Sequence, residues 1–125
     1  MIATNQRIVC MLEVGDGSLP EGLMYAWEYT FDTPYTFASA SEFSSTVNRG
    51  GTGKRNFYLI NHWLGSSLGT PDRNKAFAAN KKEQLLSRIE NCESTNGQKM
   101  NFLGVDFYNI GSALEVVNEI NGIVK

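Results

Sequence analysis

The chain has little of several residues on which common protein functions depend. Its 125 residues include one histidine, two cysteines and three prolines, and the formal net charge is -2. So small a net charge gives no reason to expect nucleic acid as an electrostatic partner, because nucleic-acid-binding domains usually carry a basic surface. One histidine without carboxylates at ligand-like spacing predicts neither a metal site nor a cofactor.

Targeting and redox signals are equally sparse. Cys10 and Cys92 are too few for a disulfide framework, and Cys10 is expected to be a small buried hydrophobe inside a strand. No apolar run is long enough to span a bilayer, and no Asn-x-Ser/Thr sequon occurs. Residues 1–7 lack the order of charged and apolar residues found in a signal peptide, so the sequence leaves the localisation undetermined.

Three apolar runs, residues 7–14, 56–61 and 102–105, predict strands. The first run does not alternate with polar residues, which is typical of a strand buried on both faces of a parallel sheet. Residues 23–31 fit either an extended segment or a short helix, which the Thr33-Pro34 pair would end. Residues 38–55 form a connection of a length that usually marks a functional or mobile loop.

Two segments have the pattern of amphipathic helices. The first begins at a capping box from Asn80 to Glu83, and the second at Ser112 to Glu115, with Asn121-Gly122 as its C-terminal cap. The side chains expected to face the core are Leu85, Leu86, Ile89 and Cys92 on the first helix, and Leu114, Val116, Val117 and Ile120 on the second.

The repeated order of strand and helix favours an α/β fold with parallel strands and crossover helices. Half of a closed barrel and a small doubly wound sheet both remain open at this point. Residues 50–54, Gly-Gly-Thr-Gly-Lys, do not form a phosphate loop. Asn48 stands where that motif needs glycine, and Arg55 where it needs Ser or Thr.

Asp106 is the strongest candidate for a functional residue. It follows the strand at 102–105, and α/β folds place their chemistry at the carboxyl ends of strands. No cationic residue is near it in sequence, so a partner must come from elsewhere in the fold. Asn61 and His62 end the strand before it and are expected at the same edge.

Three segments, Asp32–Tyr35, Asn56–Trp63 and Asn101–Tyr108, together resemble the phospholipase C-like phosphodiesterases, the superfamily of the phosphatidylinositol-specific phospholipase C X domain. The resemblance spans nearly all of residues 1–125 and implies one partial domain, the C-terminal half of a (β/α)8 TIM-barrel-like fold. The N-terminal half would be absent. Such a half exposes two strand edges and needs its other half or a second chain.

The resemblance implies a phosphoric diester hydrolase that acts on a phosphodiester lipid or head group by histidine acid/base catalysis. Both catalytic histidines of family members lie in the N-terminal half, so this chain would supply only part of the site and would be inactive alone. Asp106 would hold one histidine in the required tautomer. The residues implied to position substrate are His62, Asn61, Tyr108, Trp27 and Asp32.

Two other functions remain open: an inactive fragment that acts as a binding module, and a small ligand-binding α/β domain in which Asp106 is structural. The partner implied by the resemblance is a phosphodiester or phospholipid substrate, with transient membrane-surface contact, and full-length relatives are often secreted. Family members also often carry a cysteine where Ser45 stands, which could bridge to one like Cys92. That bridge is missing here.

Overall fold

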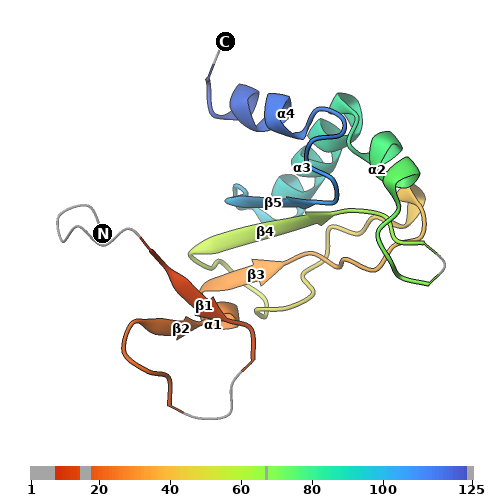
Figure 1. The fold of residues 1–125 in the computed structure, drawn as a ribbon. Helices are drawn as coiled ribbons and strands as arrows, with labels where there is room; N and C mark the ends of the chain where they lie inside the picture. The colour runs from red at the N-terminus through yellow and green to blue at the C-terminus, as the bar shows by residue number, and fades with distance from the viewer. Residues whose placement is uncertain (1–7, 15–17, 67, 124–125) are drawn as a thin grey trace.

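The structure, a computed structural model, describes residues 8–14, 18–66 and 68–123. These residues form an α/β chain with a short 3-10 helix at Ala40–Glu42 (Figure 1). In chain order the other elements are β1 (Cys10–Leu12), β2 (Leu23–Tyr25), α1 (Ala26–Tyr29), β3 (Thr30–Asp32), β4 (Phe57–His62), α2 (Arg73–Ala79), α3 (Lys82–Asn96), β5 (Phe102–Val105) and α4 (Ala113–Ile120).

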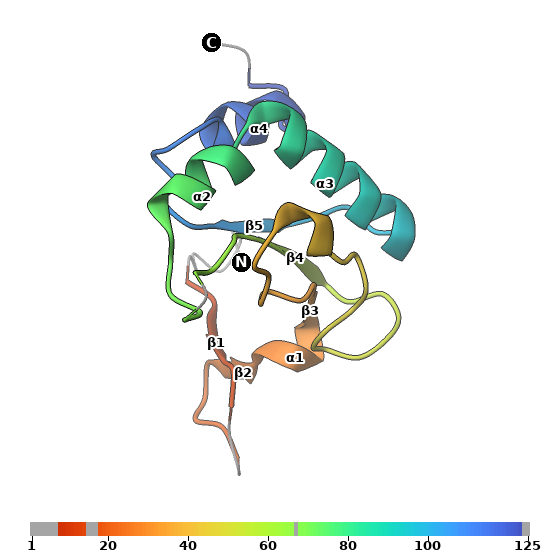
Figure 2. The same ribbon diagram turned by 90° about the vertical axis from the view of Figure 1, so that its right-hand side faces the viewer.

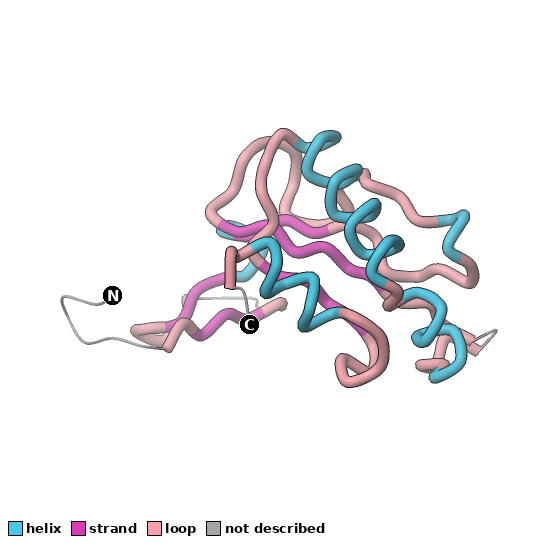
Figure 3. Tube along the Cα trace, turned by 90° about the horizontal axis from the view of Figure 1, so that it is seen from above, coloured by secondary structure: helices cyan, strands magenta, loops and turns pink. Residues whose placement is uncertain are grey.

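The strands form two parallel sheets, which confirms the predicted α/β class with parallel strands. One sheet pairs β1 with β2, and the other has the order β3-β4-β5. The register of the second sheet sets Asp32 beside Leu59 and Asn61 beside Gly104. Helices α2, α3 and α4 cover one face of this sheet, whereas β1 and β2 project to one side (Figures 2 and 3).

The core lies between the second sheet and its helices. Tyr58 and Ile60 of β4 point toward the helices, and the ring of Phe31 stacks on Tyr58 with 4.2 Å between centroids. Helix α3 contributes the face predicted from its sequence, with Leu85, Ile89 and Cys92 buried and Leu86 partly buried. Because side chains alternate along a strand, the positions between Tyr58, Ile60 and His62 face the opposite side.

The predicted cap of α3 is wrong. The helix begins after Lys81, and Asn80 instead ends α2, a helix that the sequence analysis did not predict. The side-chain amide of Asn80 donates to the carbonyls of Asp106 and Ile110, at 2.9 and 3.1 Å. The side chain of Asn80 is therefore used for these long-range bonds and does not cap α3. Asp72 begins α2, because its carboxylate accepts the backbone N–H groups of Asn74 and Lys75.

Two predictions of burial are also wrong. Cys10 is exposed, because β1 pairs with β2 at the side of the molecule and no described helix covers it. On α4 the buried residues are Ala113 and Val116, whereas Leu114 and Ile120 are 61% and 45% exposed. The apolar stripe of α4 is therefore wider than its contact with the core.

Candidate functional site

A buried carboxylate lies at the carboxyl end of β3. Asp32 is fully buried and accepts hydrogen bonds from Arg49 Nε at 3.0 Å, from the Arg49 backbone N–H at 2.9 Å and from Asn61 Nδ2 at 3.0 Å. An antiparallel bridge between Asp32 and Arg49 aligns the long loop with β3. Because buried charges are stable only when paired, these partners explain why a carboxylate is tolerated here.

Arg49 is held from several sides. Its guanidinium carbon lies 4.1 Å from the ring centroid of Trp27 and 4.6 Å from that of Tyr35. Its Nη1 pairs with Glu13, while its side chain keeps 28% of its surface exposed. Burial opposes the charge, but the hydrogen bond to Asp32 and the negative charges of Asp32 and Glu13 together outweigh it and raise the pKa of Arg49. The result is a fixed, partly exposed cation at the end of the strands.

The sequence analysis did not identify Arg49 as a site residue. It predicted only that the loop that contains it, residues 38–55, is functional or mobile. The sequence contains one local signal of this arrangement, the glycine at position 50. The structure shows why glycine stands there, because its φ is 88°. A Cβ at this position would lie 2.1 Å from the carbonyl oxygen of Thr30, so only glycine lets the loop approach β3 this closely. Arg49 pairs with Asp32 because the loop approaches β3 here. The separation of 17 residues between the two would not have predicted this pair.

Asn61 connects the ends of β3 and β4. Its side-chain amide also donates to the carbonyl of Thr33 at 2.6 Å, and its backbone N–H donates to Thr33 Oγ1 at 3.0 Å. Next to it, a Cβ on Gly104 would come within 3.0 Å of the Trp63 ring, so Gly104 leaves room for that ring. Asn61 therefore orients Asp32 and shares its face of the sheet.

His62 lies on the opposite face of β4. Its side chain is fully buried, its ring centroid is 4.7 Å from that of Phe43, and its Nε2 is 2.9 Å from the carbonyl of Ala79. Burial lowers the pKa of His62, so the ring is neutral and Nε2 donates to Ala79. The structure does not bring His62 to Asp32 or Asp106; its ring contacts Phe43 and the carbonyl of Ala79 instead.

Asp106 directly follows β5. Its Oδ2 is buried and has no hydrogen-bond partner among the described residues. Burial raises the pKa of this carboxyl group. The turn is fixed by the bond from Asn80 to the Asp106 carbonyl and by Phe107, which has a φ of 51°. Tyr108, two residues on, is 66% exposed.

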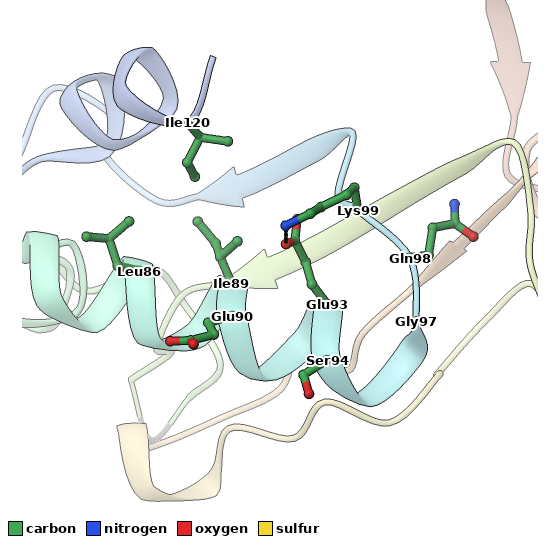
Figure 4. Close-up of a pocket in the computed structure, with 9 residues that line it drawn as sticks. All are labelled: Leu86, Ile89, Glu90, Glu93, Ser94, Gly97, Gln98, Lys99 and Ile120. Carbon is green, nitrogen blue, oxygen red and sulfur yellow. Dashed lines mark hydrogen bonds and ion pairs between the residues drawn. The ribbon is translucent and has the colours of Figure 1, made fainter. Parts of the chain in front are cut away.

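Two features lie away from these residues. A groove of about 660 Å³ lies between α3 and α4, with Leu86, Ile89 and Ile120 at its base and the Glu93–Lys99 ion pair at its rim (Figure 4).

The second feature is a contact between the long loop and α3. Ser45 Oγ lies 3.4 Å from Cys92 Sγ. The two positions at which relatives would form a bridge are therefore neighbours.

These observations define a class of protein: an α/β domain with polar side chains gathered at the carboxyl ends of parallel strands. The chain matches the family described as PI-PLC X 1 over residues 1–121, and it therefore belongs to the PI-PLC X family. It is 25% identical over 132 residues to "PI-PLC X domain-containing protein 1" of Arthroderma benhamiae. That match covers 98% of this chain and 43% of the relative. No solved structure matches the chain.

Within the described ranges, no helix has the length and apolar character needed to cross a membrane. The same residues contain no group of three or more His, Cys, Asp or Glu side chains placed to hold a metal ion.

Proposed function

We propose that this chain supplies part of the active site of a phospholipase C-like phosphoric diester hydrolase, acting on a phosphodiester lipid or head group. The remaining part would come from an N-terminal half or from a second chain. Membership of the PI-PLC X family gives the class. The observation that carries the proposal is the buried Oδ2 of Asp106, which accepts no hydrogen bond from any residue that the structure describes.

A buried acceptor without a donor costs about 1–3 kcal/mol, so its retention needs a reason. The N–H of a histidine from the completing segment would supply the missing hydrogen bond. Asp106 would then fix the tautomer of that histidine and stabilise its charged form, as a triad aspartate does. This histidine would take a proton from the nucleophilic hydroxyl, and a second histidine would protonate the leaving oxygen.

Arg49 is proposed to bind the substrate. Its planar cation is partly exposed and fits a phosphate or vicinal hydroxyl groups. Asp32, which accepts a hydrogen bond from Asn61, orients Arg49, and Trp27 supports it from one side. Tyr108 is proposed to contact substrate at the rim, because most of its ring is exposed.

We also propose that this chain forms the C-terminal half of a (β/α)8-like barrel, and the arrangement of the sheet supports this. Strands β3, β4 and β5 are neighbours in chain order and have α2, α3 and α4 on a single face, as strands and helices have in a (β/α)8 barrel. No other described strand pairs with β5, so its outer edge can accept a further strand. A doubly wound sheet needs helices on both faces and gains no support here.

Transient contact with a lipid surface is proposed for the loops at this end of the sheet. Phe77 of α2 is 62% exposed and borders a pocket with residues 109–111, next to the exposed Tyr108. In the loop after β4, Leu68 is 87% exposed. Aromatic and apolar side chains on adjacent loops can enter the interfacial region of a bilayer.

One observation favours a non-catalytic binding module instead. The only histidine of the chain is buried and neutral, so the chain itself has no histidine that can reach a substrate and act as a general base. The two proposals are separated by measuring hydrolysis of phosphatidylinositol and of a chromogenic diester by the chain alone and combined with an N-terminal half. Activity only in the combination supports the enzyme. A folded complex without activity supports the binding module.

A further inference from the structure

One side chain of another element holds the turn between β5 and α4, which contains Asp106. Asn80 ends α2 and is buried, with 1% of its surface exposed. Its side-chain amide donates one hydrogen bond to the carbonyl of Asp106, at 2.9 Å, and another to the carbonyl of Ile110, at 3.1 Å. A primary amide has two N–H groups, so both donors of Asn80 are used on this turn.

The backbone of Asn80 contacts the same turn. Its carbonyl accepts the N–H of Ser112 at 2.8 Å. Gly111, the residue before, has a φ of 81°, and a Cβ there would lie 2.4 Å from the carbonyl oxygen of Asn80. Only glycine permits this close approach. The turn is therefore joined to Asn80 by three hydrogen bonds and by a glycine that makes room for it.

The end of α2 is in turn fixed to the sheet. The carbonyl of Ala79, the residue before Asn80, accepts a hydrogen bond from Nε2 of the buried, neutral His62 at 2.9 Å. The N–H of Asn80 donates to the carbonyl of Ala76 within α2, at 2.8 Å. Asn80 therefore stands on a support that is anchored to β4, and it transmits that anchorage to the turn after β5.

This anchorage opposes two costs in the turn. Phe107 has a φ of 51°, a conformation that residues other than glycine rarely adopt. Oδ2 of Asp106 is buried without a hydrogen-bond partner among the described residues, and burial raises the pKa of the carboxyl group. A turn free to move would relax Phe107 and expose the carboxylate to water. The bonds from Asn80 hold the peptide that follows Asp106 and so prevent this relaxation.

We propose that Asn80 is the positioning residue of Asp106, and that its amide keeps the carboxylate buried and aimed in one direction. An asparagine suits this role because it donates two hydrogen bonds without a charge. An ionised aspartate at this position could donate none and would add a negative charge beside Asp106. Only the catalytic consequence rests on the proposed function, because the orientation of Asp106 is a property of the chain alone.

The test is a pH titration of the Asp106 carboxyl group by ¹³C NMR in the full chain, with the signal assigned by its loss in Asp106→Asn. In Asn80→Ala the pKa of Asp106 should fall toward that of an exposed aspartate, because the carboxylate would reach water. Ile89→Ala, a destabilising change in the buried face of α3, should leave this pKa unchanged. An unchanged pKa in Asn80→Ala, or an equal shift in Ile89→Ala, would overturn the proposal.

A variant on the other side of the contact gives an independent result. Gly111→Ala places a methyl group against the carbonyl of Asn80 and should lower the pKa of Asp106 as Asn80→Ala does. Gly53→Ala also has a positive φ but no atom within 4 Å, so it should leave the pKa of Asp106 unchanged. Where Asn80→Ala does not fold, Asn80→Ser, which keeps one donor, replaces it. A Gly111→Ala chain with the unmodified pKa of Asp106 would contradict the proposal.

Kinetics of the complete enzyme test the catalytic consequence. Asn80→Ser should lower kcat about 10²-fold with nearly constant KM, because misplacing a catalytic group by about 1 Å has an effect of this size. A higher KM with unchanged kcat would contradict a role that acts through Asp106. A complete, unmodified enzyme without diesterase activity would refute the proposed function, and the NMR titration alone would then decide whether Asn80 positions Asp106.

Discussion

Replacing Asp32 with asparagine should destabilise the chain through one identifiable loss. The substitution keeps the shape of the side chain but removes the charge that pairs with Arg49. Removing one partner of a fully buried pair costs about 3–5 kcal/mol. Because Arg49 keeps 28% of its side chain exposed and retains Glu13, we expect a smaller loss, about 2–3 kcal/mol in the free energy of unfolding.

The assay is urea unfolding at pH 7, followed by circular dichroism and tryptophan fluorescence, for Asp32→Asn, Arg49→Met and the double variant. The double-mutant cycle should give a coupling energy of about 1–2 kcal/mol. Glu90→Gln, an exposed change on α3, is the matched control and should cost little. A loss below about 0.5 kcal/mol for Asp32→Asn, or a coupling energy near zero, would refute the assigned role of the pair.

Four other predictions follow from single contacts. Ser45→Cys should form a disulfide with Cys92 under oxidising conditions, because the two side chains touch across 47 residues of sequence. The bond should add about 2–4 kcal/mol to the stability, an effect that reductant should abolish and that Ser44→Cys should not reproduce. Gly50→Ala should destabilise the chain in the same unfolding assay, because its Cβ would meet Thr30 at 2.1 Å, whereas Gly53→Ala has no such contact and tests the effect of positive φ alone. The pKa of His62 is lowered on folding, so the stability it contributes is present above about pH 6.5 and is lost as the pH falls below that value; a His62→Gln variant with the same pH dependence as the unmodified chain would contradict this. The pKa of Asp106 is raised on folding, so the stability that Asp106 contributes falls as the pH rises above about 4, and Asp106→Asn in the chain alone should remove this contribution from the difference between unfolding curves at pH 4 and pH 7.

Part of the fold could be predicted because the signals are local. Strands β4 and β5 are continuous apolar runs, and the buried face of α3 follows the helical repeat. The orientation of His62 was also available from the sequence, because it follows Tyr58 and Ile60 in steps of two and therefore shares their face.

The remainder depended on contacts between distant segments. The exposure of Cys10 follows from what lies beside β1, which no property of the β1 sequence determines. Asn80 has the spacing of a helix cap but is used to hold the turn after β5. The pairing of Asp32 with Arg49 requires the loop to fold back over β3, and sequence spacing alone does not encode that partner.

The central claim is that Asp106 orients a histidine supplied from outside this chain. The most direct test is to compare the turnover of a phosphodiester substrate by the complete enzyme with and without Asp106→Asn, alongside thermal unfolding of both proteins. We expect kcat to fall about 10³- to 10⁴-fold with little change in stability, because the histidine would be left in the wrong tautomer. A change of less than about 10-fold in kcat would remove Asp106 from the site and contradict the proposed role.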